Sequence, residues 1–83
     1  MNILCFGIAR DIVQGSSFEI AINEQPKTVA ELRAWLSEHY PQFQQLKHYM
    51  IAINQEYATD ETALNSKDEI VIIPPVSGGG LSP

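Results

Sequence analysis

The sequence predicts an α+β fold, in which one main helix packs on one face of a mixed sheet of four or five strands. Two observations lead to this fold: strand-forming runs lie on both sides of one helical segment, and 83 residues leave room for a single small domain. With 45% hydrophobic residues, the chain is too apolar to be disordered. We expect one domain over residues 1–76 and a flexible, Gly-rich tail over residues 77–83.

The first elements predicted are two strands. The apolar run over residues 3–9 is too short for a stable helix and is rich in strand-forming residues. After a turn that contains glycine, residues 18–22 alternate, with Phe18, Ile20 and Ile22 on one face. Two such strands joined by a short loop predict a hairpin.

A helix follows. Thr28 and Glu31 have the spacing of a capping box, which marks a helix N-terminus. Pro41 predicts that the helix ends near His39 or Tyr40. Its apolar stripe consists of Val29, Leu32, Leu36 and Tyr40. We expect the first three of these to be buried against Ile20 or Ile22 and the later strands.

The second half of the chain predicts more strands. Residues 41–46 form a short turn that carries Phe43 and Leu46 inward, and Leu64 anchors a polar loop. The expected strands are residues 49–53, 57–58 and 69–73, with a tight turn over 54–56 and a stop at Pro74 and Pro75. Strand, strand, helix, strand, strand, strand is the order of a β-grasp architecture.

The charge balance excludes several kinds of partner. Ten acidic and five basic residues give a net charge of −5, and the basic residues are scattered singly. Nucleic acid and anionic membrane are therefore poor candidates, since both need clustered basic residues. No apolar run reaches the length of a membrane span, and the N-terminus lacks the pattern of a signal peptide. We expect a soluble, cytoplasmic domain.

The side chains give little support for catalysis by this chain alone. Cys5 is the single cysteine and lies in an apolar run, where a thiol behaves as a small hydrophobic group. His39 and His48 have no neighbouring ligands, so no metal site is expected. The acidic pairs at 60–61 and 68–69 fit solvated turns.

Two features point instead to a protein partner. The strands over residues 3–8 and 70–73 are apolar at nearly every position, although only alternate side chains can face the helix. The remaining apolar side chains predict an exposed interaction face. The second feature is the run Gly78-Gly79-Gly80, because a terminal glycine carboxylate has no Cβ and is open to activation by a partner.

Segments spread over residues 3–79 resemble the small, sulfur-carrying subunits of molybdopterin synthases, which are ubiquitin-like proteins. The segment Pro74-Pro75-Val76-Ser77-Gly78-Gly79 carries most of this resemblance. The other matching segments are residues 4–11, 32–41, 54–58 and 64–73.

The resemblance implies a ubiquitin-like β-grasp fold and a reaction cycle at the tail. An E1-like adenylyltransferase would use ATP to adenylate the carboxylate of Gly79, and sulfur would then replace AMP to leave a thiocarboxylate. The tail would insert into the large subunit of a heterotetrameric synthase and give its sulfur to the pterin precursor. The chain itself would bind no cofactor. Gly78, like Gly79, would keep the tail narrow because it has no side chain. The partner-binding residues would be Phe6, Tyr57, Ile73, Pro75 and Val76.

The sequence departs from this pattern after Gly79, because Gly80-Leu81-Ser82-Pro83 follow and an internal glycine has no free carboxylate. A processing peptidase trims these residues, or the chain is an inactive precursor, or the extension is not native. Either Gly79 or Gly80 becomes the mature terminus. Two other functions stay open: the related sulfur carrier of thiamine biosynthesis, and a ubiquitin-like modifier or binding module.

Overall fold

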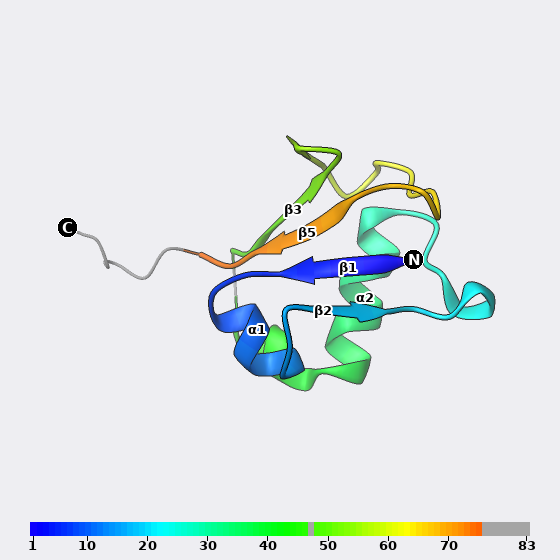
Figure 1. Ribbon diagram of the computed structural model, residues 1–83. Coiled ribbons are helices and arrows are strands. Elements are labelled where there is room, and N and C mark those ends of the chain that lie inside the picture. The colour runs from blue at the N-terminus through cyan, green and yellow to red at the C-terminus, as the bar shows by residue number, and fades with distance from the viewer. Residues whose placement is uncertain (47, 76–83) are drawn as a thin grey trace.

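The computed structural model describes residues 1–46 and 48–75. Its centre is a five-stranded mixed sheet in the order β2-β1-β5-β3-β4, with the long helix α2 behind it (Figure 1). β1 and β5 run parallel, and every other neighbouring pair is antiparallel. The strands are β1 (Asn2–Cys5), β2 (Ser17–Glu19), β3 (Met50–Ile53), β4 (Glu56–Tyr57) and β5 (Ile70–Ile73). The α+β β-grasp fold expected from the sequence is confirmed.

The predicted hairpin at the start of the chain is wrong in one respect. β1 ends at Cys5, and Ile8–Val13 form the short helix α1 where the sequence predicted strand and turn. Gly7 turns the chain with φ 55°, a region that favours glycine. Ala9, Ile12 and Val13 then pack inward at helical spacing. β1 and β2 still pair antiparallel, but across a helix instead of a tight turn.

The second correction concerns Ile22. β2 ends at Glu19, and Ile22–Glu24 form the short 3-10 helix η1. Ile20 is buried as predicted, whereas Ile22 is 85% exposed. The alternation seen in the sequence over residues 18–22 therefore continued beyond the end of the strand.

Helix α2 (Val29–His39) agrees with the prediction. Thr28 is its N-cap, and the Thr28 hydroxyl accepts a hydrogen bond of 3.2 Å from the Glu31 N–H. The Glu31 carboxylate reaches back to the Lys27 N–H at 2.9 Å, one residue before the cap. Val29, Leu32 and Leu36 have no exposed surface, so the predicted stripe is the face of the helix that packs on the sheet.

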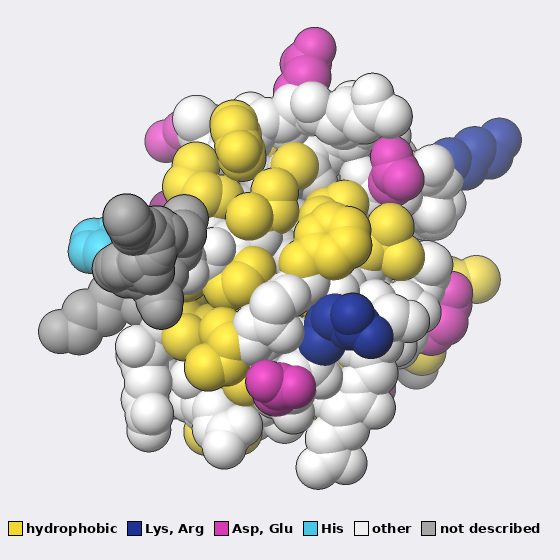
Figure 2. Space-filling model, turned by 60° about the vertical axis from the view of Figure 1, so that its left-hand side comes forward, with side chains coloured by type: hydrophobic (Ala, Val, Ile, Leu, Met, Phe, Trp, Pro, Cys, Tyr) yellow, Lys and Arg dark blue, Asp and Glu magenta, His cyan; other side chains and the backbone are white. Residues whose placement is uncertain are grey.

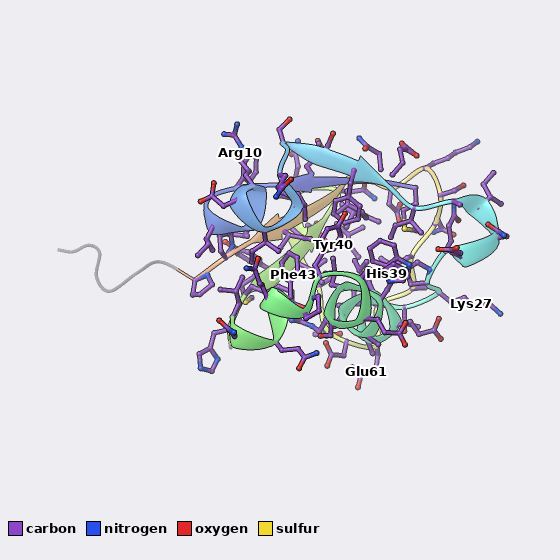
Figure 3. The ribbon with its side chains drawn as sticks, turned by 90° about the horizontal axis from the view of Figure 1, so that it is seen from below. Arg10, Lys27, His39, Tyr40, Phe43 and Glu61 are labelled. Atoms are coloured by element: carbon purple, nitrogen blue, oxygen red, sulfur yellow. The ribbon has the colours of Figure 1, made fainter. Side chains whose placement is uncertain are left out.

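The core lies between α2 and the near face of the sheet, and aromatic rings close one end of it. Phe18 of β2 stacks on Trp35 with ring centroids 5.6 Å apart. Phe43, in the 3-10 helix η2 (Pro41–Gln45), is fully buried and contacts Tyr40 and Tyr49. Figure 3 shows Tyr40 and Phe43 pointing inward between the helix and the sheet. None of the helices in the described ranges is long and apolar enough to cross a membrane.

The β3–β4 connection is the tight turn expected at residues 54–56. Asn54 and Gln55 have φ values of 52° and 73°, which suit a two-residue hairpin turn. The Asn54 side chain donates to Asp68 and accepts from the Glu69 N–H, at 3.0 and 2.9 Å. These bonds fix the turn against the start of β5.

Candidate docking face and tail root

The side of the sheet away from α2 has no covering layer within the described residues. Ile3 and Cys5 of β1 and Ile70 and Ile72 of β5 are buried toward α2. Because side chains alternate along a strand, their neighbours face the other way. We call this side the open face; its apolar side chains are Leu4, Phe6, Met50, Ala52, Tyr57, Val71 and Ile73.

Strand register places these residues in two adjacent rows. Leu4 lies opposite Val71, Val71 opposite Ala52, and Ala52 opposite Tyr57. The second row pairs Ile73 with Met50. The Phe6 N–H donates to the Ile72 carbonyl at 3.3 Å, which carries the ladder one residue beyond β1 and brings Phe6 beside the second row.

Exposure separates the rim of the open face from its centre. Tyr57 is 69% exposed, Phe6 53% and Met50 41%. Val71 and Ile73, on the central strand, are half-buried. Figure 2 shows apolar side chains gathered on one face of the molecule. A continuous exposed apolar patch of this kind is typical of a protein interaction site.

The central strand β5 leads into Pro74 and Pro75 at one end of this face. β5 lies between β1 and β3; it pairs with β1 up to Ile72 and with β3 up to Ile73. Pro74 has no N–H and ends the ladder. It is half-buried and Pro75 is exposed.

Gly7 lies directly under Pro74. A Cβ added to Gly7 would be 2.9 Å from Pro74 Cγ, closer than side chains tolerate. A hollow of about 340 Å³ lies beside this contact, lined by Gly7, Ile8, Leu46, Pro74 and Pro75. The root of the tail therefore rests against the loop between β1 and α1.

Of the residues predicted to bind partners, Phe6, Tyr57 and Ile73 occur on the open face, and Pro75 lies at the tail root. Val76, Gly78 and Gly79 lie outside the described residues. Sequence reasoning did not name Leu4, Met50, Ala52 or Val71. The signal for them was present, because each occupies an alternate position of an apolar strand.

The groups that could support chemistry by the chain itself have structural roles. Burial raises the pKa of the Cys5 thiol to about 11, so the thiol stays protonated and unreactive at neutral pH. Asp60 pairs with Arg33, and Asp68 accepts hydrogen bonds from Asn54 and Asn65. Within residues 1–46 and 48–75, no group of three or more His, Cys, Asp or Glu could hold a metal ion.

Comparison with known proteins gives consistent matches over almost the whole chain. The model of the ThiS family matches residues 3–79. A molybdopterin synthase sulfur carrier subunit from Dictyostelium discoideum is 38% identical over 81 residues, which cover 94% of each chain. Another protein of that description, from Caenorhabditis elegans, is 37% identical and covers 95% of this chain and 96% of its own.

One similar solved structure is a protein–protein complex. It contains subunits 1 and 2 of the molybdopterin-converting factor from Helicobacter pylori; the matching chain is 29% identical, with a TM-score of 0.64 over 94% of this chain and 96% of that one.

Proposed function

Since this chain belongs to the ThiS family, we propose that it is the sulfur-carrier subunit of a molybdopterin synthase. One observation carries the proposal: the central strand of an uncovered apolar face runs directly into Pro74 and Pro75 and then toward Gly78 and Gly79. A partner that covers the face receives the tail at the same time. The chain then acts as a carrier whose reactive group is the end of its own backbone.

The chemistry at Gly79 has two steps before sulfur is delivered. A carboxylate oxygen of Gly79 attacks the α-phosphorus of ATP and releases pyrophosphate, which gives an acyl-adenylate. A hydrosulfide ion then attacks the carbonyl carbon, AMP leaves with the bonding electron pair, and the resulting thioacid loses its proton. The product is a thiocarboxylate, which is ionised at neutral pH and nucleophilic through sulfur.

The described side chains provide docking and no catalytic groups for this cycle. An E1-like adenylyltransferase binds ATP and catalyses the first step, so this chain needs no cofactor of its own. The large synthase subunit holds the pterin precursor that receives sulfur. Both partners require the same tail, so they bind the carrier in turn.

Residues 80–83 add a step before activation. Because residues 80–83 follow Gly79, this glycine has no free carboxylate while they are attached. A peptidase that cuts after Gly79 exposes the glycine carboxylate. The mature carrier then joins the large subunit in a heterotetramer, and a cytoplasmic location suits a cycle that consumes ATP.

Exchange of pyrophosphate into ATP tests this function. The adenylyltransferase of the same organism is assayed with the full-length chain and, separately, with a chain truncated after Gly79. We expect exchange with the truncated chain and none with the full-length chain. Given a sulfur source, intact mass should then show replacement of one oxygen by sulfur. Equal exchange by both chains, with no trimming detected by mass, would rule out activation at Gly79.

A further inference from the structure

We propose that Gly7 is a positioning residue for the chemistry at Gly79: it leaves room for the Pro74 ring and so sets the direction in which the backbone leaves the sheet. This role rests on the proposed function, in which a partner receives the tail and acts on its glycine carboxylate. It adds a residue of the domain that acts on the reacting carbonyl group through Pro74 and takes no part in the reaction itself.

The ends of β1 and β5 bring Gly7 and Pro74 together. The two strands run parallel and end side by side (Figure 1). The Phe6 N–H donates to the Ile72 carbonyl at 3.3 Å, so the chain after Phe6 comes level with the start of the tail. A Cβ on Gly7 would lie 2.9 Å from Pro74 Cγ and 3.8 Å from Pro74 Cδ. A side chain at Gly7 would therefore displace the ring or the loop beneath it.

The loop that carries Gly7 is fixed by its neighbours. The Phe6 carbonyl accepts a hydrogen bond from the Ala9 N–H at 3.0 Å, and the Gly7 carbonyl accepts one from the Arg10 N–H at 3.1 Å. Ala9 is fully buried in the core. The loop cannot retreat from an added Cβ without disturbing these contacts, so the Pro74 ring would have to move instead.

The segment that rests on Gly7 is stiff. Proline has a fixed φ, and a residue that precedes proline is restricted to extended backbone. Both limits apply to Pro74, because Pro75 follows it, and the second applies to Ile73. A change of direction at Pro74 is therefore passed on to the residues that follow Pro75.

The length of the tail turns a small error at Pro74 into a large one at the reacting atom. Four residues lead from Pro75 to Gly79, and they span at most about 14 Å when extended. At that reach, a change of about 20° in direction displaces the Gly79 carbonyl carbon by about 5 Å. A misplacement of about 1 Å can cost about 100-fold in rate. Bending the short tail back into line would reduce the fraction of bound carrier that reacts.

The test measures exchange of pyrophosphate into ATP against carrier concentration, with the chain truncated after Gly79 and the adenylyltransferase of the same organism. The variants are Gly7→Ala, Pro74→Ala and the double substitution. Gly15→Ala is the matched control, because a Cβ there would meet the Ser17 carbonyl oxygen at 3.6 Å, an ordinary contact. Circular dichroism checks that each variant is folded.

We expect Gly7→Ala to lower kcat about 10-fold and to change KM by less than about 3-fold, since docking through the open face is retained. The control should change neither by more than about 2-fold. Pro74→Ala removes the ring and should lower kcat about 3-fold by loosening the root of the tail. In that background Gly7→Ala should cost less than about 2-fold more, because the ring it displaces is gone.

Three results overturn the inference and leave the proposed function standing. They are an unchanged kcat for Gly7→Ala, a higher KM at unchanged kcat, which would place the effect on the neighbouring Phe6, and an equal loss of kcat with and without the Pro74 ring. If Gly7→Ala does not fold, Pro74→Ala decides: a lower kcat at unchanged KM supports the inference, and any other result overturns it. If the parent chain gives no exchange, the inference and the proposed function both fail.

Discussion

The Arg33 guanidinium lies over the ring of Tyr49, with 4.7 Å between Arg33 Cζ and the ring centroid. The same side chain donates to the Tyr49 carbonyl at 3.2 Å and to Asp60 Oδ1 at 2.9 Å. One residue of α2 is thus tied to the residue that precedes β3 and to the loop before β5. These contacts hold the helix in place on the sheet.

Replacing Arg33 by Lys should destabilise the fold by about 1 kcal/mol. Lysine keeps the charge but loses the planar group that stacks on Tyr49 and bonds two acceptors at once. Urea unfolding followed by tryptophan fluorescence measures the change. Arg10→Lys, at an exposed position of α1, is the matched control and should change stability by less than about 0.5 kcal/mol. Equal effects of the two substitutions would show that the Arg33 contacts contribute nothing.

Leu36→Ala should cost about 2–5 kcal/mol, because it removes a fully buried side chain and leaves a cavity between α2 and the sheet. This is a large part of the stability of about 5–10 kcal/mol expected for a small domain. Glu38→Ala, two residues along the same helix and exposed, controls for helix propensity. A cost below about 1 kcal/mol for Leu36→Ala would contradict the observed packing.

Phe6→Asp and Tyr57→Asp should each weaken binding to the large subunit by at least about 10-fold, since a charge would replace an apolar side chain within the contact. Both side chains are more than half exposed, so the isolated domain should remain folded. Ile22→Asp is the control, because Ile22 is 85% exposed and lies off the open face in η1. Unfolding of both test variants, or equal weakening by the control, would contradict the docking face.

Gly79→Ala, in the chain truncated after residue 79, should leave thermal stability unchanged, because the described core residues all precede Pro74 in the sequence. It should reduce sulfur transfer strongly, because the added methyl group crowds the carbonyl carbon that is attacked. Single-turnover transfer measures the effect, with Ser77→Ala as the control in the same tail. If the Gly79→Ala chain transferred sulfur as fast as the parent chain, the partner's site for the tail could not be narrow.

Stability should fall at high pH because of Cys5. Its folded pKa of about 11 lies above the ordinary thiol value, so the folded state holds the proton more tightly than the unfolded state. The resulting stabilisation is fully present below the ordinary value and is lost as pH rises from there to about 11, by about 3 kcal/mol in total. Urea unfolding at a series of pH values should show this fall, and Cys5→Ala should reduce it. Alkylation of the folded protein at pH 8 as fast as that of the unfolded chain would show that the thiol is accessible.

The sequence predicted the strands and α2 because their signals are local. A capping residue, an apolar stripe and a proline stop all lie within residues 28–41. Helix α1 was missed because its first residues, Ile8 and Ala9, continue the apolar run of β1 without a break in composition. The break is the backbone turn at Gly7, which fits closely against Pro74, 67 positions later in the sequence. Local patterns carry no information about such a contact.

For the candidate site, alternation along the apolar strands was enough to predict an uncovered face. It could not show which residues share a row, since that depends on the strand order. Met50 joins Ile73 only because β3 pairs with β5.

The position of β5 between two neighbours has a mechanical consequence. When a partner draws the tail into its site, the load passes along β5 into hydrogen bonds to β1 on one side and β3 on the other. These bonds lie across the direction of pull and would have to break together in shear, whereas a tail on an edge strand could be peeled away one bond at a time. Resistance to such a pull is governed by the unfolding rate and its barrier. The sheet should therefore stay folded when force is applied to the C-terminal segment, through repeated rounds of sulfur loading and delivery.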